Sequence, residues 1–304
     1  MVVLSFGLAF LSVLSSTVKA SPVPSLETRQ TITTLSASQI SAFKPFAFFA
    51  SAAYCDPSRT LKWDCGTNCD ANSGFLPVAS GGDGGSEQFW YVGYDPSLDT
   101  VVVAHQGTNT SSFLAELVDA DFFLSSLDPS LFPGISSSIE THSGFADSQA
   151  KSAPDILNAV QGALTTHDTT HVTITGHSLG AALSLLDAVY LPLHLPESTT
   201  FKTVVYGLPR VGNQDFADYV DAHVTNLNHI NNMKDPIPIV PGRSLGFHHP
   251  SGEVHIMENN QWVSCPGQDN TSDECIVGDV PNIFVGDEDN HDGPYDGVEM
   301  NSGC

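Results

Sequence analysis

The chain has 304 residues, of which 41% are hydrophobic and 14% are charged, a balance typical of a packed globular protein and not of a disordered one. Its 34 acidic residues outnumber its 10 basic ones, so the formal net charge is −24. Phosphate backbones and anionic lipids repel so acidic a chain, which excludes nucleic-acid binding and a polybasic attachment to membranes.

The N-terminal segment has the composition of a secretory signal peptide. Residues 2–14 are mostly apolar but too few to span a bilayer, and Val18-Lys19-Ala20 places small residues ahead of a cleavage point. We therefore expect residues 1–20 to be a signal peptide and residues 21–29 to be a pro-segment. The rest, residues 30–304, is expected to form one exported domain without a transmembrane segment.

Helices and strands are predicted to alternate along that domain. Ser36 to Gln39 has the pattern of a capping box before an apolar helix that runs towards Tyr54, and Pro45 should kink or divide this helix. Residues 55–85 are rich in Gly, Asp, Asn and Ser and are predicted to form loops. The later elements are expected, in order, as strands 88–94 and 101–104, helix 145–164, strand 171–175, helix 181–190, strand 201–206, helix 215–225, and strands 227–231 and 253–257. This alternation predicts an α/β fold with a largely parallel sheet.

The cysteines indicate disulfide bonds. All six lie after the predicted signal peptide, at Cys55, Cys65, Cys69, Cys265, Cys275 and Cys304. An even number in an exported chain predicts three disulfides, although spacing alone does not choose their pairing. No C-x-x-C pattern is present, which disfavours a zinc site. Asn109 and Asn270 each begin a sequon and are candidate N-glycosylation sites.

A nucleophile elbow is predicted at residues 176–180, which read G-H-S-L-G and match G-x-S-x-G. A β-branched strand precedes the motif and an alanine-rich helix follows it, as such an elbow requires. Gly176 and Gly180 avoid clashes in the tight turn, and the helix N-terminus favours negative charge developing near Ser178. An ordinary glycine-rich turn is the alternative. We predict that Ser178 is a catalytic nucleophile.

A serine nucleophile needs an orienting acid, which follows the serine along the chain when the serine lies on such an elbow. Asp235 comes directly after the expected strand 227–231, and Pro236 marks a loop at this point. Asp235 is therefore the predicted acid, with an ordinary turn aspartate as the alternative. Three further aspartates, Asp215, Asp218 and Asp221, fall on the expected helix 215–225 and are interpreted as its solvated face.

The general base should be a histidine that follows one more strand. His255 falls on the expected strand 253–257, and His248 and His249 precede that strand in a hairpin. His291 lies beyond it in a loop, so position and context favour His291 as the base.

The oxyanion of an acyl-transfer reaction requires backbone N–H donors. Leu179, the residue after the nucleophile, should provide one of them. The other should come from the end of an earlier buried strand, where residues 101–104 lead into Gly107 and Thr108. Gly107 permits a close approach of the backbone, and Thr108 offers both an N–H and a hydroxyl. We predict an oxyanion hole formed by Thr108 and Leu179.

With these motifs in place, the sequence resembles the fungal class 3 lipases, a family of filamentous-fungal triacylglycerol lipases and related feruloyl esterases. The resemblance spans roughly residues 31–304. It is carried by Ala53-Tyr54-Cys55, Gly107-Thr108, His142 to Phe145, Gly176 to Gly180, Tyr206 to Asn213, Asp235 to Pro238, and His291 with the terminal Cys304. One segment departs from the pattern: the family usually has Phe-Arg before Gly107, whereas this chain has His105-Gln106 and so lacks a buried cation there.

The resemblance implies an α/β-hydrolase-like fold in which a short helical lid covers the active site. It implies the same triad, Ser178, Asp235 and His291, and the same oxyanion donors, Thr108 and Leu179. It also implies a disulfide pattern, namely Cys55–Cys304, Cys65–Cys69 and Cys265–Cys275.

The segment after Thr108 predicts an amphipathic helix. Its apolar residues fall on one face, with Glu116 and Asp119 off that face, and they are Phe113, Leu114, Leu117 and Val118. Periodicity alone does not decide whether this face covers the core or the active site. The family places its lid here, so the resemblance implies that the face covers Ser178 in water and contacts lipid at an oil surface.

The sequence therefore predicts a secreted carboxylic ester hydrolase, a triacylglycerol lipase that works through an acyl-enzyme and needs no cofactor or metal. A feruloyl esterase is the alternative within the family, and the apolar lid favours the lipase. A non-catalytic binding protein on the same fold is a remote alternative. We expect a monomer that acts on a lipid or other ester and contacts the lipid–water interface transiently. Residues 288–299 have near EF-hand spacing, but they begin with Glu and lack helical flanks, so a solvated acidic loop is expected there.

Overall fold

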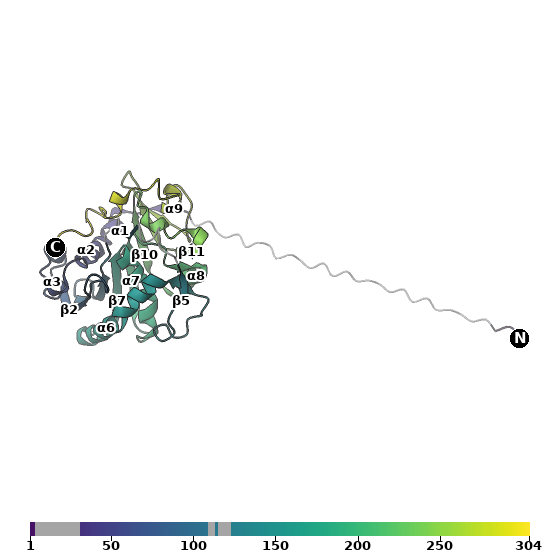
Figure 1. The fold of residues 1–304 in the computed structure, drawn as a ribbon, viewed down its shortest axis with the longest axis horizontal. Coiled ribbons are helices and arrows are strands. Elements are labelled where there is room, and N and C mark those ends of the chain that lie inside the picture. Colours follow the sequence, from purple (N-terminus) through teal and green to yellow (C-terminus); the bar gives the residue numbers. More distant parts are fainter. Residues whose placement is uncertain (4–30, 109–112, 115–122) are drawn as a thin grey trace. The chain divides into compact units, whose positions relative to one another are not determined.

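A computed structural model describes residues 1–3, 31–108, 113–114 and 123–304. The chain divides into two units, Met1–Gln30 and Thr31–Cys304, and all the described helices and strands belong to the second (Figure 1). Most of the predicted signal peptide and all of the predicted pro-segment lie outside the described residues. Within the described part of the chain, no helix is both long and apolar enough to cross a bilayer.

The second unit is built on a mixed sheet that has nine strands within the described residues, in the order β1-β13-β12-β10-β8-β7-β4-β3-β2. The five central strands are mutually parallel, and they are β4 (Thr100–His105), β7 (His171–His177), β8 (Thr200–Tyr206), β10 (Leu227–Asn232) and β12 (Glu253–Ile256). Antiparallel strands flank them, namely β3 (Trp90–Asp95) and β2 (Leu76–Gly81) at one side and β13 (Trp262–Cys265) and β1 (Thr33–Thr34) at the other. The predicted α/β fold with a mostly parallel sheet is confirmed.

A second, antiparallel sheet lies outside the main one. Its described strands follow the order β11-β9-β6-β5, and they are β11 (Phe247–His248), β9 (Gly212–Asn213), β6 (Glu140–His142) and β5 (Leu124–Ser126). This sheet was not predicted from the sequence, because strands of two or three residues are too short to show an alternating pattern.

The N-terminal helix is divided as predicted. Ser36 and Gln39 form a complete capping box that starts α1 (Ala37–Ser41), and α2 (Lys44–Ala52) begins three residues after α1 ends. Pro45 lies in the first turn of α2, where its missing N–H has no intrahelical partner to lose.

The prediction of loops throughout residues 55–85 was wrong. This stretch contains α3 (Pro57–Thr60), α4 (Thr67–Ala71) and the edge strand β2. Its local composition disfavours a strand, but β2 pairs with β3 along one edge, and the register shifts between Pro77 and Ala79. A proline is tolerated at an edge because no neighbour on that side needs its N–H. Tertiary pairing therefore overrides local propensity here.

Helices cover both faces of the main sheet. Along β4, Val101 and Val103 join an apolar core with α6 (Ser143–His167) and α7 (Leu179–Tyr190), whereas Val102 and Ala104 join a second core with α2. Figure 1 shows α7 across β7, with α6 beside it. The remaining described helices are α8 (Gln214–His223), α9 (Ile276–Asp279) and the 3-10 turns Leu191–Leu193, Ile237–Ile239, Arg243–Leu245 and Glu288–Asn290.

Three disulfides join the cysteines as Cys55–Cys304, Cys65–Cys69 and Cys265–Cys275. The first connects the end of the α2 segment to the last residue of the chain. Hydrogen bonds hold the same end in place, since Asn68 donates to the Ser302 carbonyl and Ser51 to the Glu299 carbonyl. The chain after the last strand is thereby fastened against the N-terminal helices.

Candidate active site

Ser178 lies at a sharp turn between β7 and α7. Its backbone has φ 61° and ψ −127°, in the positive-φ region that a non-glycine residue rarely adopts. Two glycines make the turn possible: a Cβ on Gly176 would overlap the Gly180 carbonyl group, and a Cβ on Gly180 would overlap the His105 carbonyl oxygen. The geometry is that of a nucleophile elbow.

Asp235 and His291 meet although 56 residues separate them in sequence. Both side chains are fully buried, and His291 Nδ1 donates to Asp235 Oδ2 at 2.8 Å. The other carboxylate oxygen, Oδ1, accepts from the Ile237 backbone N–H at 2.8 Å. Because Nδ1 donates to Asp235, Nε2 is the ring nitrogen that can take a proton from the serine. Neither His291 Nε2 nor Ser178 Oγ has a hydrogen-bond partner among the described residues.

The backbone of His291 is held by two neutral donors. His177, the residue before the nucleophile, donates from Nε2 to the His291 carbonyl at 2.9 Å, and the Tyr295 hydroxyl donates to the same oxygen at 2.9 Å. The rings of His177 and His291 lie 4.3 Å apart, centroid to centroid. These contacts place the candidate base directly beside the elbow.

Burial keeps His177 and the neighbouring Tyr54 hydroxyl neutral. Burial first, and then the neighbouring His291, lower the pKa of His177 well below its ordinary value, so His177 is the neutral Nε2–H tautomer. Its Nδ1 then accepts from the Tyr54 hydroxyl at 2.6 Å. Burial, followed by Asp292, raises the pKa of Tyr54 well above its ordinary value, so this hydroxyl keeps its proton. Neither Tyr54 nor His177 was predicted to have a role, although both lie within the motifs that carried the resemblance.

The predicted oxyanion donors come from neighbouring segments. Leu179 is the first residue of α7, and Thr108 follows β4 by three residues. Gly107, which precedes Thr108, packs so closely that a Cβ would overlap the Tyr54 hydroxyl and lie 2.6 Å from the His177 carbonyl oxygen. Glycine is therefore required where the strand end approaches the elbow.

The other candidate histidines are engaged elsewhere. His255 donates to the Met233 carbonyl at 2.8 Å, and His249 donates to the Pro238 carbonyl at 2.7 Å. His248 lies 3.3 Å from Asp269, and no contact between these three histidines and Asp235 is recorded among the described residues. The geometry thus favours His291, as the sequence did.

A buried polar cluster supports the loop that carries Asp235. Arg210 Nε donates to Asp269 at 2.8 Å, and its guanidinium also donates to the carbonyls of Ile239 and Pro241. Nearby, burial raises the pKa of Glu253 to about 8, so this carboxyl stays neutral at pH 7.

Three described residues approach the geometry of a metal site: Glu253, Cys265 and Cys275 bring ligand atoms within 4.8 Å of one another. The two sulfurs, however, are bonded to each other and cannot act as thiolate ligands. In the acidic loop with near EF-hand spacing, residues 288–299, His291 turns inward to Asp235.

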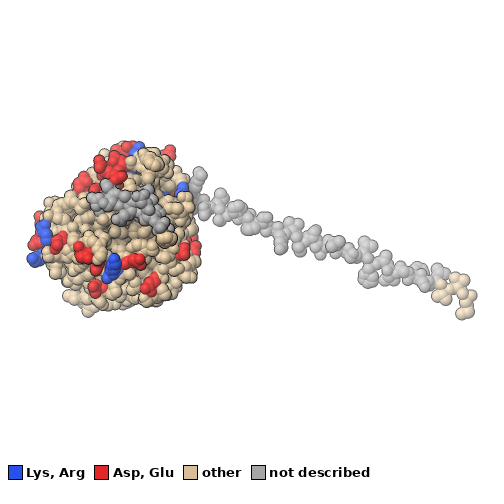
Figure 2. All heavy atoms as spheres, viewed as in Figure 1, with Lys and Arg blue, Asp and Glu red and all other residues tan. Residues whose placement is uncertain are grey.

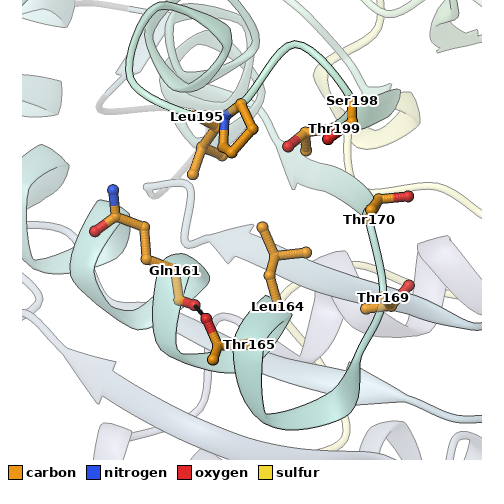
Figure 3. Close-up of a pocket in the computed structure, with 9 residues that line it drawn as sticks. Gln161, Leu164, Thr165, Thr169, Thr170, Leu195, Ser198 and Thr199 are labelled. Atoms are coloured by element: carbon orange, nitrogen blue, oxygen red, sulfur yellow. Dashed lines mark hydrogen bonds between the residues drawn. The ribbon is translucent and has the colours of Figure 1, made fainter.

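One pocket lies away from Ser178. It has a volume of ≈ 330 Å³ and is lined by the end of α6, by the turn into β7 at Thr169 and Thr170, and by the loop before β8. Figure 3 shows Gln161, Leu164 and Thr165 on one wall and Ser198 and Thr199 on the other. This is where β7 and β8 begin, whereas Ser178 follows the end of β7, so the pocket is separate from the elbow.

The predicted lid is only partly described. Phe113 is 3% exposed and packs against Phe145 in the core, with ring centroids 6.1 Å apart, and Leu114 is half-buried against the same core. Leu117 and Val118 lie outside the described residues, as does the sequon residue Asn109. The other sequon residue, Asn270, is part-buried: its side-chain amide donates to the Pro266 carbonyl and accepts from the Ser272 N–H.

The fold and the elbow define a serine hydrolase of the α/β type, and comparison with known proteins agrees. The sequence profile of the family described as Lipase (class 3) matches residues 102–245. A secreted mono- and diacylglycerol lipase of Malassezia globosa is 36% identical over 70% of this chain and 69% of its own length. Lipase II from Rhizopus niveus has a similar structure, with a TM-score of 0.76 and 27% identity over 89% of this chain and 99% of that one. A solved triacylglycerol lipase whose catalytic centre is described as a serine protease triad has a TM-score of 0.75 at 24% identity, covering 89% of this chain and 99% of that one.

The chain therefore belongs to the class 3 lipase family, and the family resemblance seen in the sequence is confirmed. It is a carboxylic ester hydrolase of the lipase type, and its substrate is an ester lipid.

Proposed function

We propose that the chain is a secreted acylglycerol lipase whose catalytic triad is Ser178, His291 and Asp235. The observation that carries this proposal is the fully buried 2.8 Å contact between His291 Nδ1 and Asp235, beside a serine held at positive φ on an elbow. Secretion is supported by the apolar N-terminus and by the relatives that are named secreted lipases.

The proposed reaction proceeds in two halves. Ser178 Oγ attacks the ester carbonyl while His291 Nε2 takes its proton, and Asp235 stabilises the imidazolium. The Thr108 and Leu179 N–H groups hold the oxyanion, and the imidazolium then protonates the departing glycerol oxygen. Water next attacks the acyl-enzyme with His291 again as base, which releases the fatty acid and restores the Ser178 hydroxyl.

Ser178→Ala tests the chemistry. Hydrolysis of p-nitrophenyl butyrate should fall by about three or more powers of ten, because the nucleophile is lost. Circular dichroism should match that of the wild type, since Ala is smaller than Ser. A variant that keeps a tenth of the wild-type activity would contradict the triad.

A substrate panel tests the acylglycerol assignment. Tributyrin, dibutyrin and methyl ferulate should be compared, because the relatives are named mono- and diacylglycerol lipases whereas the sequence predicts triacylglycerol hydrolysis. If dibutyrin is cleaved much faster than tributyrin, the enzyme is a mono- and diacylglycerol lipase and the triacylglycerol prediction is wrong. If methyl ferulate is cleaved fastest, the feruloyl esterase alternative is favoured.

Contact with a lipid surface is part of the proposal. Phe284 is 91% exposed and Val285 is 43% exposed, on a turn held firmly next to Asp235: the Asp287 N–H donates to the Lys234 carbonyl, and a Cβ on Gly286 would lie 2.7 Å from Pro236. Acidic side chains predominate over basic ones on the face shown in Figure 2, so an uncharged lipid surface fits better than an anionic one.

Phe284→Ser should weaken binding to triolein emulsion by about tenfold, because insertion of the ring is lost, and should leave p-nitrophenyl butyrate hydrolysis unchanged. Leu76→Ser is the matched control, since Leu76 is 46% exposed on the edge strand β2. Equal effects of the two substitutions would show that exposed apolar area in general, and not this turn, binds lipid.

In the proposed lid, Phe113→Ser removes a ring that packs against Phe145. We expect the rise in rate beyond the solubility limit of tributyrin to weaken in this variant. Simple saturation in the wild type across that limit would contradict a lid function.

A further inference from the structure

A buried polar network lies behind the elbow and takes no part in the proposed chemistry. His105, the last residue of β4, donates from Nε2 to Asp187 Oδ2 at 2.7 Å, and both side chains are fully buried. Gln149 on α6 donates to the other carboxylate oxygen of Asp187 at 2.8 Å. Burying a carboxylate is costly unless it is paired, and here each oxygen of Asp187 accepts a hydrogen bond, although His105 Nδ1 and Gln149 Oε1 have no partner among the described residues.

The network joins the two elements that carry the predicted oxyanion donors. His105 precedes Thr108 by three residues, and Asp187 lies on α7, whose first residue is Leu179. The His105 carbonyl oxygen is packed so closely to Gly180 that only glycine fits there. A side-chain bond thus reinforces a backbone contact between the same two elements.

The residue after His105 is also fixed. The Gln106 N–H donates to the Phe89 carbonyl at 2.8 Å, and the Phe89 N–H donates to Gln106 Oε1 at 2.9 Å. The strand end is therefore held from two sides, by Phe89 just before β3 through Gln106 and by α7 through His105. These are the two positions at which the chain departs from the Phe-Arg pattern noted in the sequence.

We propose that His105 and Asp187 are positioning residues that together set the separation between the Thr108 and Leu179 N–H groups. The inference rests on the oxyanion hole of the proposed function. Because the oxyanion forms only in the transition state, misplacement of a donor should lower kcat and leave KM nearly unchanged.

Two substitutions at His105 separate hydrogen bonding from packing. His105→Gln places an amide N–H near the position of imidazole Nε2 and should keep kcat for p-nitrophenyl butyrate within about threefold of the wild type. His105→Leu fills similar space without a donor and should lower kcat by about ten- to a hundredfold at unchanged KM. The inhibition constant of butylboronic acid, whose serine adduct places an oxygen in the oxyanion hole, should rise by the same factor.

Gln149→Leu is the matched control for stability. It removes a donor to the same carboxylate from α6, which carries neither oxyanion donor, so thermal unfolding should shift while kcat does not. If His105→Leu does not fold, His105→Asn, whose amide is too short to reach Asp187, takes its place.

A folded His105→Leu enzyme with wild-type kcat and wild-type boronate affinity would overturn the inference, as would an equal loss of kcat in Gln149→Leu. The proposed function fails in a different way, through an active Ser178→Ala variant or a wild-type enzyme that butylboronic acid does not inhibit.

Discussion

The three disulfides close loops of very different length, and this difference makes a quantitative prediction about stability. Cys55–Cys304 spans 249 residues, Cys265–Cys275 spans 10 and Cys65–Cys69 spans 4. In the loop-entropy model, removing them by paired Cys→Ser substitution costs about 5.5, about 2.7 and about 1.9 kcal/mol of unfolding free energy, respectively. For a unit of this size, the first loss lowers the melting temperature by about 10 °C.

Urea unfolding followed by tryptophan fluorescence measures these losses, and m-values checked for constancy show whether the unfolded state has changed. Cys55→Ser/Cys304→Ser should be the least stable of the three variants. Equal losses in that variant and in Cys65→Ser/Cys69→Ser would refute the entropic reasoning. Such a result would mean that native contacts, such as that between Asn68 and the Ser302 carbonyl, decide how firmly the C-terminus is held.

Three further predictions concern buried groups. The pKa of Glu253 is raised by burial from 4.5 to about 8, so its contribution to stability is present below pH 4.5 and is lost as pH rises through 8. Glu253→Gln should reduce the difference in melting temperature between pH 5 and pH 8, whereas the exposed Glu258→Gln should not. His249→Ala should spare kcat and His291→Ala should abolish it; equal severity would mean that the wrong base has been chosen. Gly207→Ala should lower kcat by at least about tenfold, measured with p-nitrophenyl butyrate, because its Cβ would lie 2.6 Å from His291 Cε1 at φ +56°.

Much of the fold could be predicted because the central strands are buried on both faces and read as apolar runs. Residues 101–104, which are all apolar and buried, fall within β4 for this reason. The edge strand β2 could not be recognised, since Pro77 and Gly81 are unfavourable in an isolated strand and only pairing with β3 stabilises it.

The candidate triad was predictable from motif, topology and chain order. Ser178 and Asp235 follow the parallel strands β7 and β10, and parallel strands bring their C-terminal ends to one edge. His291 lies 26 residues after the antiparallel strand β13, so its position was predicted from chain order and not from the sheet. Motif and chain order therefore led to the pair that the structure brings into contact. The bond between His105 and Asp187 was not predictable, because 82 residues separate them and no periodic pattern links a strand end to the middle of a later helix.

The protonation states around His291 follow from the same packing. In the proposed reaction His291 becomes an imidazolium while a second imidazole, His177, lies 4.3 Å away, centroid to centroid. A charged His177 would oppose that step. Burial lowers its pKa instead, and its two hydrogen bonds, from Tyr54 and to the His291 carbonyl, are those of a neutral ring. The positive charge develops on His291 because His291 takes the Ser178 proton in the proposed reaction. Neutral His177 and Tyr54 do not oppose this charge, and the Asp235 carboxylate at 2.8 Å stabilises it.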